Sequence, residues 1–227
     1  MISFDVSTDV GELREVHRML MVPSFRPGEL MPEDSFIARF DHGAEAVLAQ
    51  DKDGRMLGAA VVDRFRDTVL LEYLVTAPES RGMGIGSGLM SAVLSGWGRS
   101  GSVMLAEFDR PDVQSPHPLH GDPAARLRFY ARFGMLALDL PYFQPPVSED
   151  CSREHGMLLA VFDRDGSTAE RGALDATQQR AVQRYLDDIL ESADDPEAQR
   201  LRAAAAAHGG LRALALDRYA EIARSPL

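Results

Sequence analysis

The sequence holds few of the residues that mark exported, nucleic-acid-binding or membrane-spanning proteins. Its one cysteine, Cys151, excludes an internal disulfide framework and fits a reducing cytosol. Lys52 is the only lysine, and this preference for arginine over lysine indicates a GC-rich genome. The net charge of −11 argues against a nucleic-acid partner, which requires a basic face. No apolar run is long enough to span a bilayer, and the first residues, MISFDVSTDV, lack a signal-peptide pattern. We therefore expect a cytoplasmic protein with no nucleic-acid or membrane partner.

What the 227 residues do contain is enough apolar material, 45%, for one full core and an extension. Runs rich in strand-forming residues predict strands at 2–6, 44–50, 55–65, 69–75, 102–109, 135–143 and 156–164. Apolar residues at helical spacing predict helices at 9–21, 32–40, 85–97 and 124–133. The order is β-α-α-β-β-β-α-β-α-β-β, which indicates an α/β class.

After Asp165 the composition shifts to alanine, leucine, arginine and acid, with no strand signal. We expect a domain at 1–165 and a helical extension at 166–227, its two or three helices broken near Pro196 and at Gly209–Gly210. The extension carries an apolar face that must be covered, formed by Leu174, Val182, Tyr185, Leu186, Ile189 and Leu190. It can pack on its own core or on a second subunit, and we lean towards a homodimer.

The stretch SRGMGIGSGLM at residues 80–90 is the most informative part of the sequence. One arginine precedes four glycines, Gly82, Gly84, Gly86 and Gly88. A dinucleotide fingerprint fails because its third glycine falls on Ser87 or Leu89, and a Walker loop fails because no lysine follows. The glycines connect a predicted buried strand to a predicted helix, so backbone amides at a helix N-terminus can bind an anion. The pattern predicts a pyrophosphate site, and the plainer alternative is a tight turn whose glycines allow close packing.

The segment VTAPESRGMGIGSGLM resembles the acetyl-CoA loop of the GCN5-related N-acetyltransferases (GNAT), whose signature is [QR]-x-x-G-x-[GA] after a central strand. Some 45 residues on, AARLRFYARFGM (124–135) resembles the family's later helix, with Tyr130 four residues before Gly134. The order of elements agrees over residues 2–163. The resemblance implies a GNAT fold, with a mixed central sheet of about seven strands flanked by helices, and acetyl-CoA as cosubstrate.

The resemblance also assigns roles to individual residues. The implied acetyl-CoA contacts are Leu74, Val75, Arg81, Gly82, Met83, Gly84, Ile85 and Gly86, where the amides near the first two polarise the thioester carbonyl. Tyr130 is the implied general acid for the leaving thiolate, and its alternative is a core residue of an amphipathic helix. Pro123 stands where family members often have an asparagine, so that side-chain contact with CoA is missing here.

Two lone carboxylates are the candidates for the general base. Glu72 in VLLEYLV and Glu107 in VMLAEFD are each surrounded by apolar residues, which raises a carboxyl pKa. Each can instead be a solvent-facing strand residue, and water can replace a base. Removing the true base should erase the acidic limb of the rate–pH profile.

Three further groups have plainer interpretations. Cys151 lies in a polar run and reads as a surface thiol rather than a nucleophile, although His155 follows closely. His117 and His120 have a spacing that a metal could use, but a proline-rich loop explains them equally well, so we expect no metal. The segment 142–145 can be a turn or a wall of the acceptor pocket.

Together these patterns predict an acyltransferase that moves an acetyl group from acetyl-CoA to a primary amine, on a small molecule or a peptide, by direct attack. The alternatives are another acyl-CoA donor, a different acceptor, or an acyl-CoA sensor without activity. The acetyl transfer assay separates the last of these from an enzyme.

Overall fold

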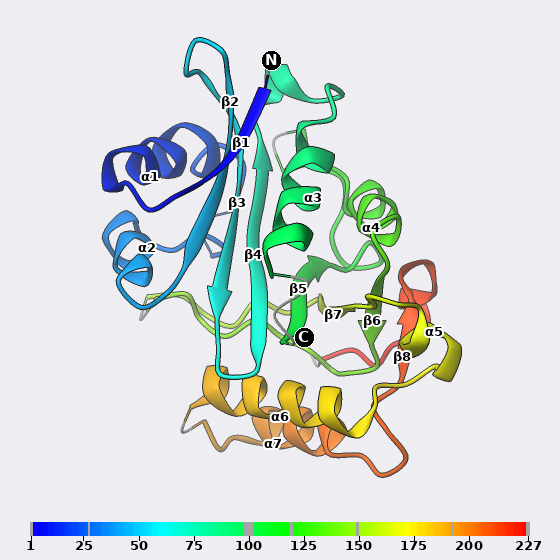
Figure 1. Ribbon diagram of the computed structural model, residues 1–227. Helices are drawn as coiled ribbons and strands as arrows, with labels where there is room; N and C mark the ends of the chain where they lie inside the picture. Colours follow the sequence, from blue (N-terminus) through cyan, green and yellow to red (C-terminus); the bar gives the residue numbers. More distant parts are fainter. Residues whose placement is uncertain are drawn as a thin grey trace. The chain divides into compact units, whose positions relative to one another are not determined.

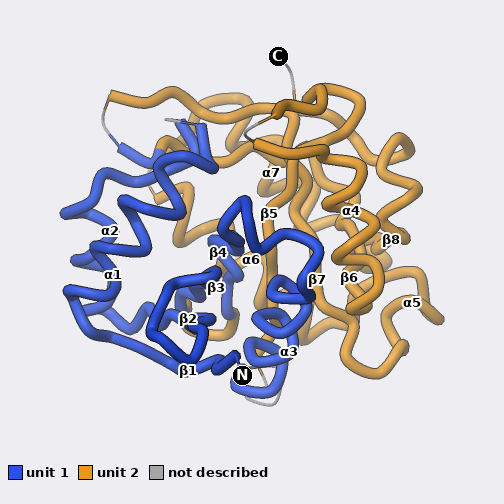
Figure 2. Tube along the Cα trace, turned by 90° about the horizontal axis from the view of Figure 1, so that it is seen from above, with its two compact units in different colours: residues 1–64, 69–101, 147–149 blue, residues 65–68, 102–146, 150–227 orange. Residues whose placement is uncertain are grey.

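The structure is a computed structural model that describes residues 2–26, 28–97, 102–118, 120–148, 150–191 and 193–225. The chain divides into two compact units, coloured separately in Figure 2. Unit 1 comprises residues 1–64, 69–101 and 147–149, and unit 2 comprises residues 65–68, 102–146 and 150–227. The domain boundary expected near residue 165 does not coincide with the division between these two units, and it stays a prediction.

Unit 1 holds an antiparallel run of strands in the order β1-β2-β3-β4. They are β1 (Ile2–Ser7), β2 (Glu45–Asp51), β3 (Met56–Arg64) and β4 (Thr68–Thr76). The predicted hairpin after β2 is confirmed, because the N–H of Gly54 donates to the carbonyl of Asp51 at 3.0 Å. The helices are α1 (Val10–Val16), continued by the π-helix η1 (His17–Met21), then α2 (Glu33–Phe40) and α3 (Ile85–Trp97).

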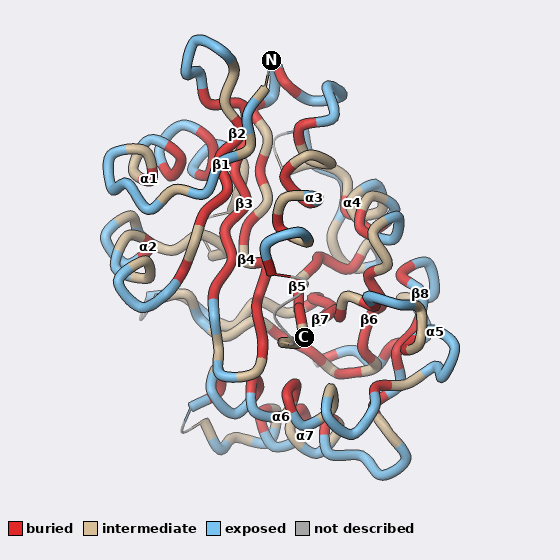
Figure 3. Tube along the Cα trace, in the orientation of Figure 1, coloured by how far each residue is buried: buried red, intermediate tan, exposed pale blue. Residues whose placement is uncertain are grey.

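The strands of unit 1 are covered on both faces (Figure 1). On one face α1 and α2 bury a core that includes Leu13 and Phe36, packed with Ala59 and Val61 of β3. On the other face α3 packs on β3, where Gly58 meets its first turns. Two-sided cover explains why eight consecutive residues of β3, from Met56 to Asp63, are buried, as the red trace in Figure 3 shows.

A β-bulge interrupts the pairing of β3 with β4. Val61 pairs with Tyr73 and Val62 pairs with Leu71, so Glu72 is an extra residue on β4. A bulged residue leaves the regular alternation of the strand and can be aimed at a new partner. This local irregularity decides where one of the two candidate bases points.

Unit 2 holds a second antiparallel run, in the order β5-β7-β6-β8. Its strands are β5 (Val103–Asp109), β6 (Met135–Leu138), β7 (Met157–Phe162) and β8 (Ala213–Ala215), and its helices are α4 (Pro123–Ala131), α5 (Ser167–Arg171), α6 (Ala176–Leu190), α7 (Pro196–Ala205) and the 3-10 helix η3 (Leu216–Glu221). Helix α4 packs on β5 and β6, α6 packs on β5, and α7 packs on α6.

The structure corrects two expectations in unit 2. The extension is not helical throughout, because residues 213–215 form β8 and pair with β6, with Ala137 opposite Leu214. Three residues are too few to give a period-2 pattern, which is why no strand signal was visible. The strand predicted at 135–143 ends at Leu138, and the α/β class itself is as expected.

The helix break expected near Pro196 is confirmed, because α6 ends at Leu190 and α7 begins at Pro196, whereas α7 ends at Ala205, before the break expected at Gly209–Gly210. Asp175 caps α6 in a capping box with Gln178, and Asp195 caps α7 directly before Pro196. The apolar face of α6 is buried within the chain, with Val182 and Leu186 fully buried. A second subunit is therefore not needed to cover this face, and the homodimer stays a prediction.

A buried arginine fastens the end of the extension to the segment after β5. The guanidinium of Arg110, 1% exposed, pairs with Asp112 at 3.1 Å. It also donates to the carbonyls of Tyr219 at 3.0 Å, Ile222 at 3.2 Å and Ala223 at 3.4 Å. A buried charge needs such partners, so residues 219–223 belong to the folded structure of unit 2.

Candidate active site

The glycine loop of unit 1 connects β4 to α3, as the sequence predicts. The 3-10 turn η2 (Pro78–Ser80) follows β4, residues 81–84 form a turn, and α3 begins at Ile85. Gly82 and Gly84 both have φ of +80°, a left-handed conformation that glycine adopts readily. The first helical hydrogen bond runs from the N–H of Gly88 to the carbonyl of Gly84 at 2.9 Å. The N–H groups of the first turn therefore lack an acceptor inside the helix.

The surface of this loop suits an anion. Arg81, Gly82, Met83 and Gly84 are exposed, whereas Ile85 is 2% exposed and anchors the helix in the core. Arg81 forms no ion pair with any residue that the structure describes, and no acid lies within the loop. An unpaired guanidinium beside free helical amides matches the charge and the donors that a pyrophosphate needs.

The loop helix is seated on β3 at Gly58. A Cβ atom built at this glycine would lie 2.7 Å from the carbonyl oxygen of Val75. It would also lie 3.1 Å from Cγ2 of Ile85 and 3.1 Å from Cδ1 of Leu89. Gly58 therefore allows the first two turns of α3 to approach the strands closely, which fixes the helix end that carries the loop.

Leu74 and Val75, the implied contacts for the thioester, lie in β4 immediately before the loop. They pair with Ala60 and Ala59 of β3, and Val75 is 5% exposed while Leu74 is half-buried. These strand positions suit backbone contacts rather than side-chain contacts with a ligand. Their role in polarising a carbonyl stays a prediction.

Glu72, the first candidate base, is directed by its bulge towards an arginine. Its side chain is 10% exposed, and its carboxylate lies 3.9 Å from the guanidinium of Arg39 on α2. Arg39 also pairs with the buried Asp63. An ion pair favours the charged carboxylate and gives Glu72 a structural partner, which weakens its case as the group that receives a proton.

Tyr130, the candidate acid, lies in α4 of unit 2 and is 6% exposed. Its ring stacks on Phe108 with centroids 4.3 Å apart, and Phe129 meets it edge-on at 5.0 Å. Burial raises the pKa of Tyr130 to about 12, partly offset by the nearby charge of Arg126. Its hydroxyl makes no hydrogen bond within the described residues, so the phenol keeps its proton at neutral pH and has it available to donate.

Glu107, the second candidate base, lies on β5 in contact with two tyrosines. Its Oε1 accepts hydrogen bonds from the hydroxyl of Tyr142 and from that of Tyr185, the latter at 3.2 Å. Burial raises the pKa of Glu107, and the two hydrogen bonds partly offset this rise. Sequence reasoning missed Tyr185, which it treated only as part of an apolar helix face. The available signal was that a buried tyrosine hydroxyl needs a partner.

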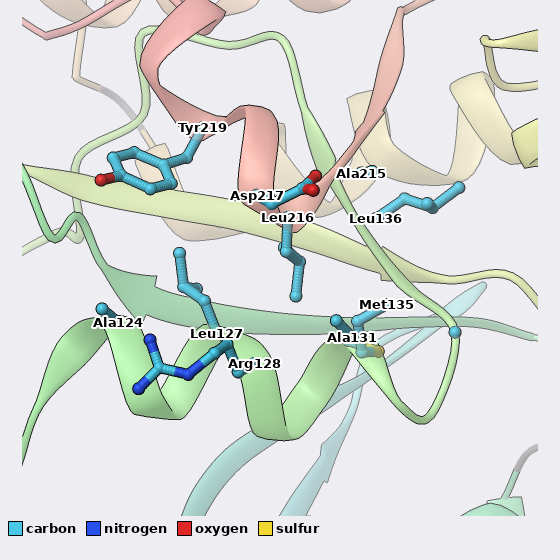
Figure 4. Close-up of a pocket in the computed structure, with 11 residues that line it drawn as sticks. Ala124, Leu127, Arg128, Ala131, Met135, Leu136, Ala215, Leu216, Asp217 and Tyr219 are labelled. Carbon is cyan, nitrogen blue, oxygen red and sulfur yellow. The ribbon is translucent and has the colours of Figure 1, made fainter.

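A separate cavity of about 590 Å³ lies on another face of α4 (Figure 4). Its lining comes from α4, β6, β8 and η3, and includes Leu127, Ala131, Leu136, Leu216 and Asp217. Tyr130 does not line it. The cavity is mostly apolar and belongs to the packing between α4 and the extension rather than to the candidate acid.

The histidine and cysteine groups stay outside the candidate site. The rings of His117 and His120 stack at 4.5 Å, and no group of three or more potential metal ligands occurs among the described residues. His155 bonds Glu197 at 2.9 Å, which gives it a partner other than Cys151. In the segment after β6, Tyr142 and Phe143 are buried, so this segment contributes to the core as well as to the cluster at Glu107.

Residues 42–134 match the family model described as an acetyltransferase (GNAT) domain. Among solved structures, a chain assigned to the GNAT acetyltransferases from Bacteroides thetaiotaomicron aligns with a TM-score of 0.61 and 20% identity, covering 86% of this chain and 99% of that one. The loading GNATL domain of CurA from Lyngbya majuscula aligns with a TM-score of 0.51 and 16% identity, covering 71% and 98%. No curated protein sequence matches the chain significantly.

The likeness to solved structures shows an α/β protein with the GNAT fold, which has eight strands in the described residues rather than about seven. The segment that matches the GNAT acetyltransferase domain model, residues 42–134, holds the loop, both lone carboxylates and Tyr130. This confirms the resemblance and supports an acyltransferase. Members of the family bind acetyl-CoA.

No helix in the described part of the chain combines the length and apolar character needed to cross a membrane.

Proposed function

We propose that this protein is an N-acetyltransferase that transfers an acetyl group from acetyl-CoA to a primary amine by direct attack, in the cytoplasm. The observation that carries the proposal is the loop at residues 81–86, within the segment that matches the family model. It combines left-handed Gly82 and Gly84, a helix N-terminus and an unpaired Arg81, which together suit a pyrophosphate. The implied contacts at residues 74, 75, 83 and 85 are part of the same proposal.

In the proposed reaction the amine nitrogen attacks the thioester carbonyl, the carbon–sulfur bond breaks, and the CoA thiolate leaves. Glu107 is the base we favour, because it is partly exposed and has no cationic partner among the described residues, whereas Glu72 pairs with Arg39. Removing a proton from the amine makes its lone pair available for attack.

Tyr130 is the proposed acid. Proton transfer from a phenol with a pKa of about 12 to a thiolate whose conjugate acid has a pKa near 8.5 is unfavourable. The gap of about 3.5 pKa units corresponds to roughly 5 kcal/mol. Tyr130 therefore acts chiefly by donating a hydrogen bond to the negative charge that develops on sulfur. It transfers its proton to the thiolate only if another proton reaches the phenolate oxygen at once.

Thermal shift with acetyl-CoA tests the loop assignment. A ligand that binds only the folded state raises the melting temperature by mass action. Gly84→Glu should abolish this rise, because the new carboxylate repels a pyrophosphate and a side chain is strained at a φ of +80°. Arg81→Ala should reduce the rise without lowering the melting temperature of the ligand-free protein.

Gly96→Glu is the matched control, since it adds the same charge at an exposed position of α3 with no described atom within 4 Å. It should bind acetyl-CoA normally. Normal binding by Gly84→Glu as well would reject the loop as the acetyl-CoA site.

A further inference from the structure

The cavity between α4 and the extension has the size of a small-molecule site and takes no part in the proposed reaction. Its volume is about 590 Å³, and sites for small organic molecules are typically clefts of about 300–1,000 Å³. Every residue that lines it belongs to unit 2, whereas the glycine loop belongs to unit 1. The cavity is therefore not part of the proposed acetyl-CoA loop.

The walls of the cavity are apolar, and small residues leave room between them. Leu127 of α4, 3% exposed, and Leu216 of η3, 1% exposed, point into the same space in Figure 4. Ala124 and Ala131 of α4 and Ala215 of β8 also line it, and each carries only a methyl group. An apolar molecule that enters such a space buries its surface against these walls, which is favourable.

The wall formed by the extension is fixed in place. Ala215 of β8 is paired with Leu136 of β6, and both line the cavity. The carbonyl of Tyr219, another lining residue, accepts a hydrogen bond from the buried guanidinium of Arg110 at 3.0 Å. A ligand would therefore meet a wall that is already formed, which lowers the entropic cost of binding.

One end of the cavity carries hydrogen-bond donors that suit an anion. In Figure 4 the guanidinium of Arg128 and the hydroxyl of Tyr219 lie at the end where Ala124 is. The side chain of Arg128 is 71% exposed, and its ion pair with Asp122 is long, 3.6 Å. The hydroxyl of Tyr219 makes no hydrogen bond within the described residues. A guanidinium with spare N–H groups beside a phenol hydroxyl can bind one carboxylate.

Asp217 limits the charge that the cavity accepts. It is exposed, lines the cavity and forms no ion pair with a residue that the structure describes. In Figure 4 its carboxylate lies further towards Leu136, away from the end formed by Arg128 and Tyr219. Because a second negative group would be repelled there, the cavity suits one carboxylate rather than two.

We propose that this cavity binds a monocarboxylate with an apolar body. Its carboxylate pairs with Arg128 and accepts a hydrogen bond from Tyr219, and its apolar part lies between Leu127 and Leu216. Burial of apolar surface supplies most of the affinity, and the ion pair selects the head group, because an exposed arginine contributes modestly. The site is formed jointly by α4 and the C-terminal extension, so it gives the extension a role in binding.

The test compares three probes that share one apolar body and differ in the head group: 4-phenylbutyrate, 4-phenylbutylamine and 4-phenylbutanol. Isothermal titration measures the Kd of each for the full chain. We expect 4-phenylbutyrate to bind at least threefold more tightly than the other two. The net charge of −11 would favour the amine through non-specific attraction, so a preference for the carboxylate reports the site itself.

Two pairs of variants on α4 locate the binding. Arg128→Gln should raise the Kd of 4-phenylbutyrate roughly three- to tenfold and leave that of 4-phenylbutanol unchanged. Arg132→Gln is its control, since Arg132 is exposed and does not line the cavity. Ala131→Trp should fill the cavity and abolish binding of both probes, whereas Ala125→Trp, at an exposed position outside the lining, should leave both Kd values unchanged.

The same titrations can overturn the inference. Tighter binding of the amine, equal binding of all three probes, or unaltered binding by Ala131→Trp would each contradict it. So would loss of 4-phenylbutyrate binding when acetyl-CoA is present in excess, because the probe would then occupy the acetyl-CoA site. If no probe binds and Ala131→Trp turns a dimer into a monomer in light scattering, a second copy of the chain covers the cavity instead.

Discussion

Gly58→Ala should destabilise the protein and weaken acetyl-CoA binding, because α3 rests on this glycine. The new Cβ would lie 2.7 Å from the carbonyl oxygen of Val75, a backbone atom that cannot rotate away, and 3.1 Å from side-chain carbons of Ile85 and Leu89. Overpacking of this kind costs about 1–3 kcal/mol. For a chain of this size each 1 kcal/mol lowers the melting temperature by about 2–4 °C, so we expect a fall of roughly 2–12 °C.

The same displacement moves the N-terminal turn of α3, which carries the proposed pyrophosphate site. Each 1 kcal/mol of lost binding energy weakens acetyl-CoA affinity about fivefold, and isothermal titration at a temperature where both proteins are folded measures it.

Gly96→Ala is the matched control for this substitution. It lies in the same helix, is exposed, and has no described atom within 4 Å of its added Cβ. Because alanine favours the helix over glycine, this variant should melt at or above the unaltered protein, by up to about 1 kcal/mol of stability. A Gly58→Ala protein that melts as high as Gly96→Ala would refute the view that the loop helix is seated on β3.

Three further predictions concern the general acid Tyr130, the stability of the fold at low pH, and the C-terminal extension. Tyr130→Phe should lower turnover roughly ten- to a thousand-fold with acetyl-CoA affinity little changed, and unchanged turnover would make Tyr130 a packing residue. Arg18 and Arg14 lower the pKa of Glu33 from 4.5 to about 2, so Glu33 stabilises the fold above about pH 4.5 and this stabilisation is lost as the pH falls towards 2. Over that pH range the melting temperature of Glu33→Gln should therefore fall less than that of the unaltered protein. Truncation after Asp165 removes β8 and the carbonyl partners of buried Arg110, so circular dichroism should show loss of cooperative unfolding, and a soluble, folded fragment would contradict this account. Light scattering of the full chain tests the predicted homodimer. A mass of 24.9 kDa at high concentration, that of one chain, would contradict it.

Features with local causes could be predicted from the sequence. The loop was found because left-handed Gly82 and Gly84 and the helical spacing after them lie within a few residues of one another. Helix caps at Asp175 and Asp195 follow from the same local chemistry. Strand β8 was missed because its three residues are defined by pairing with β6, some 75 residues away in the sequence, and not by their own pattern.

The choice between the two lone carboxylates could not be made from the sequence. Glu72 and Glu107 both stand alone in apolar strands, and their partners come from distant segments. Arg39 reaches Glu72 because a bulge turns that residue, while Tyr185 reaches Glu107 from a helix in the extension. Only tertiary structure distinguishes a carboxylate with a countercharge from one held by two phenols.

The most direct test of acetyl transfer is product analysis after incubation with acetyl-CoA and 1,4-diaminobutane. Mass spectrometry quantifies the acetylated amine, and a thiol assay quantifies free CoA in the same samples. The account predicts equal amounts of the two products, formed by the unaltered protein and strongly reduced in Glu107→Gln. Acetyl-CoA binding with no product of either kind, or CoA release without acetylated amine across a wider set of amines, would contradict it.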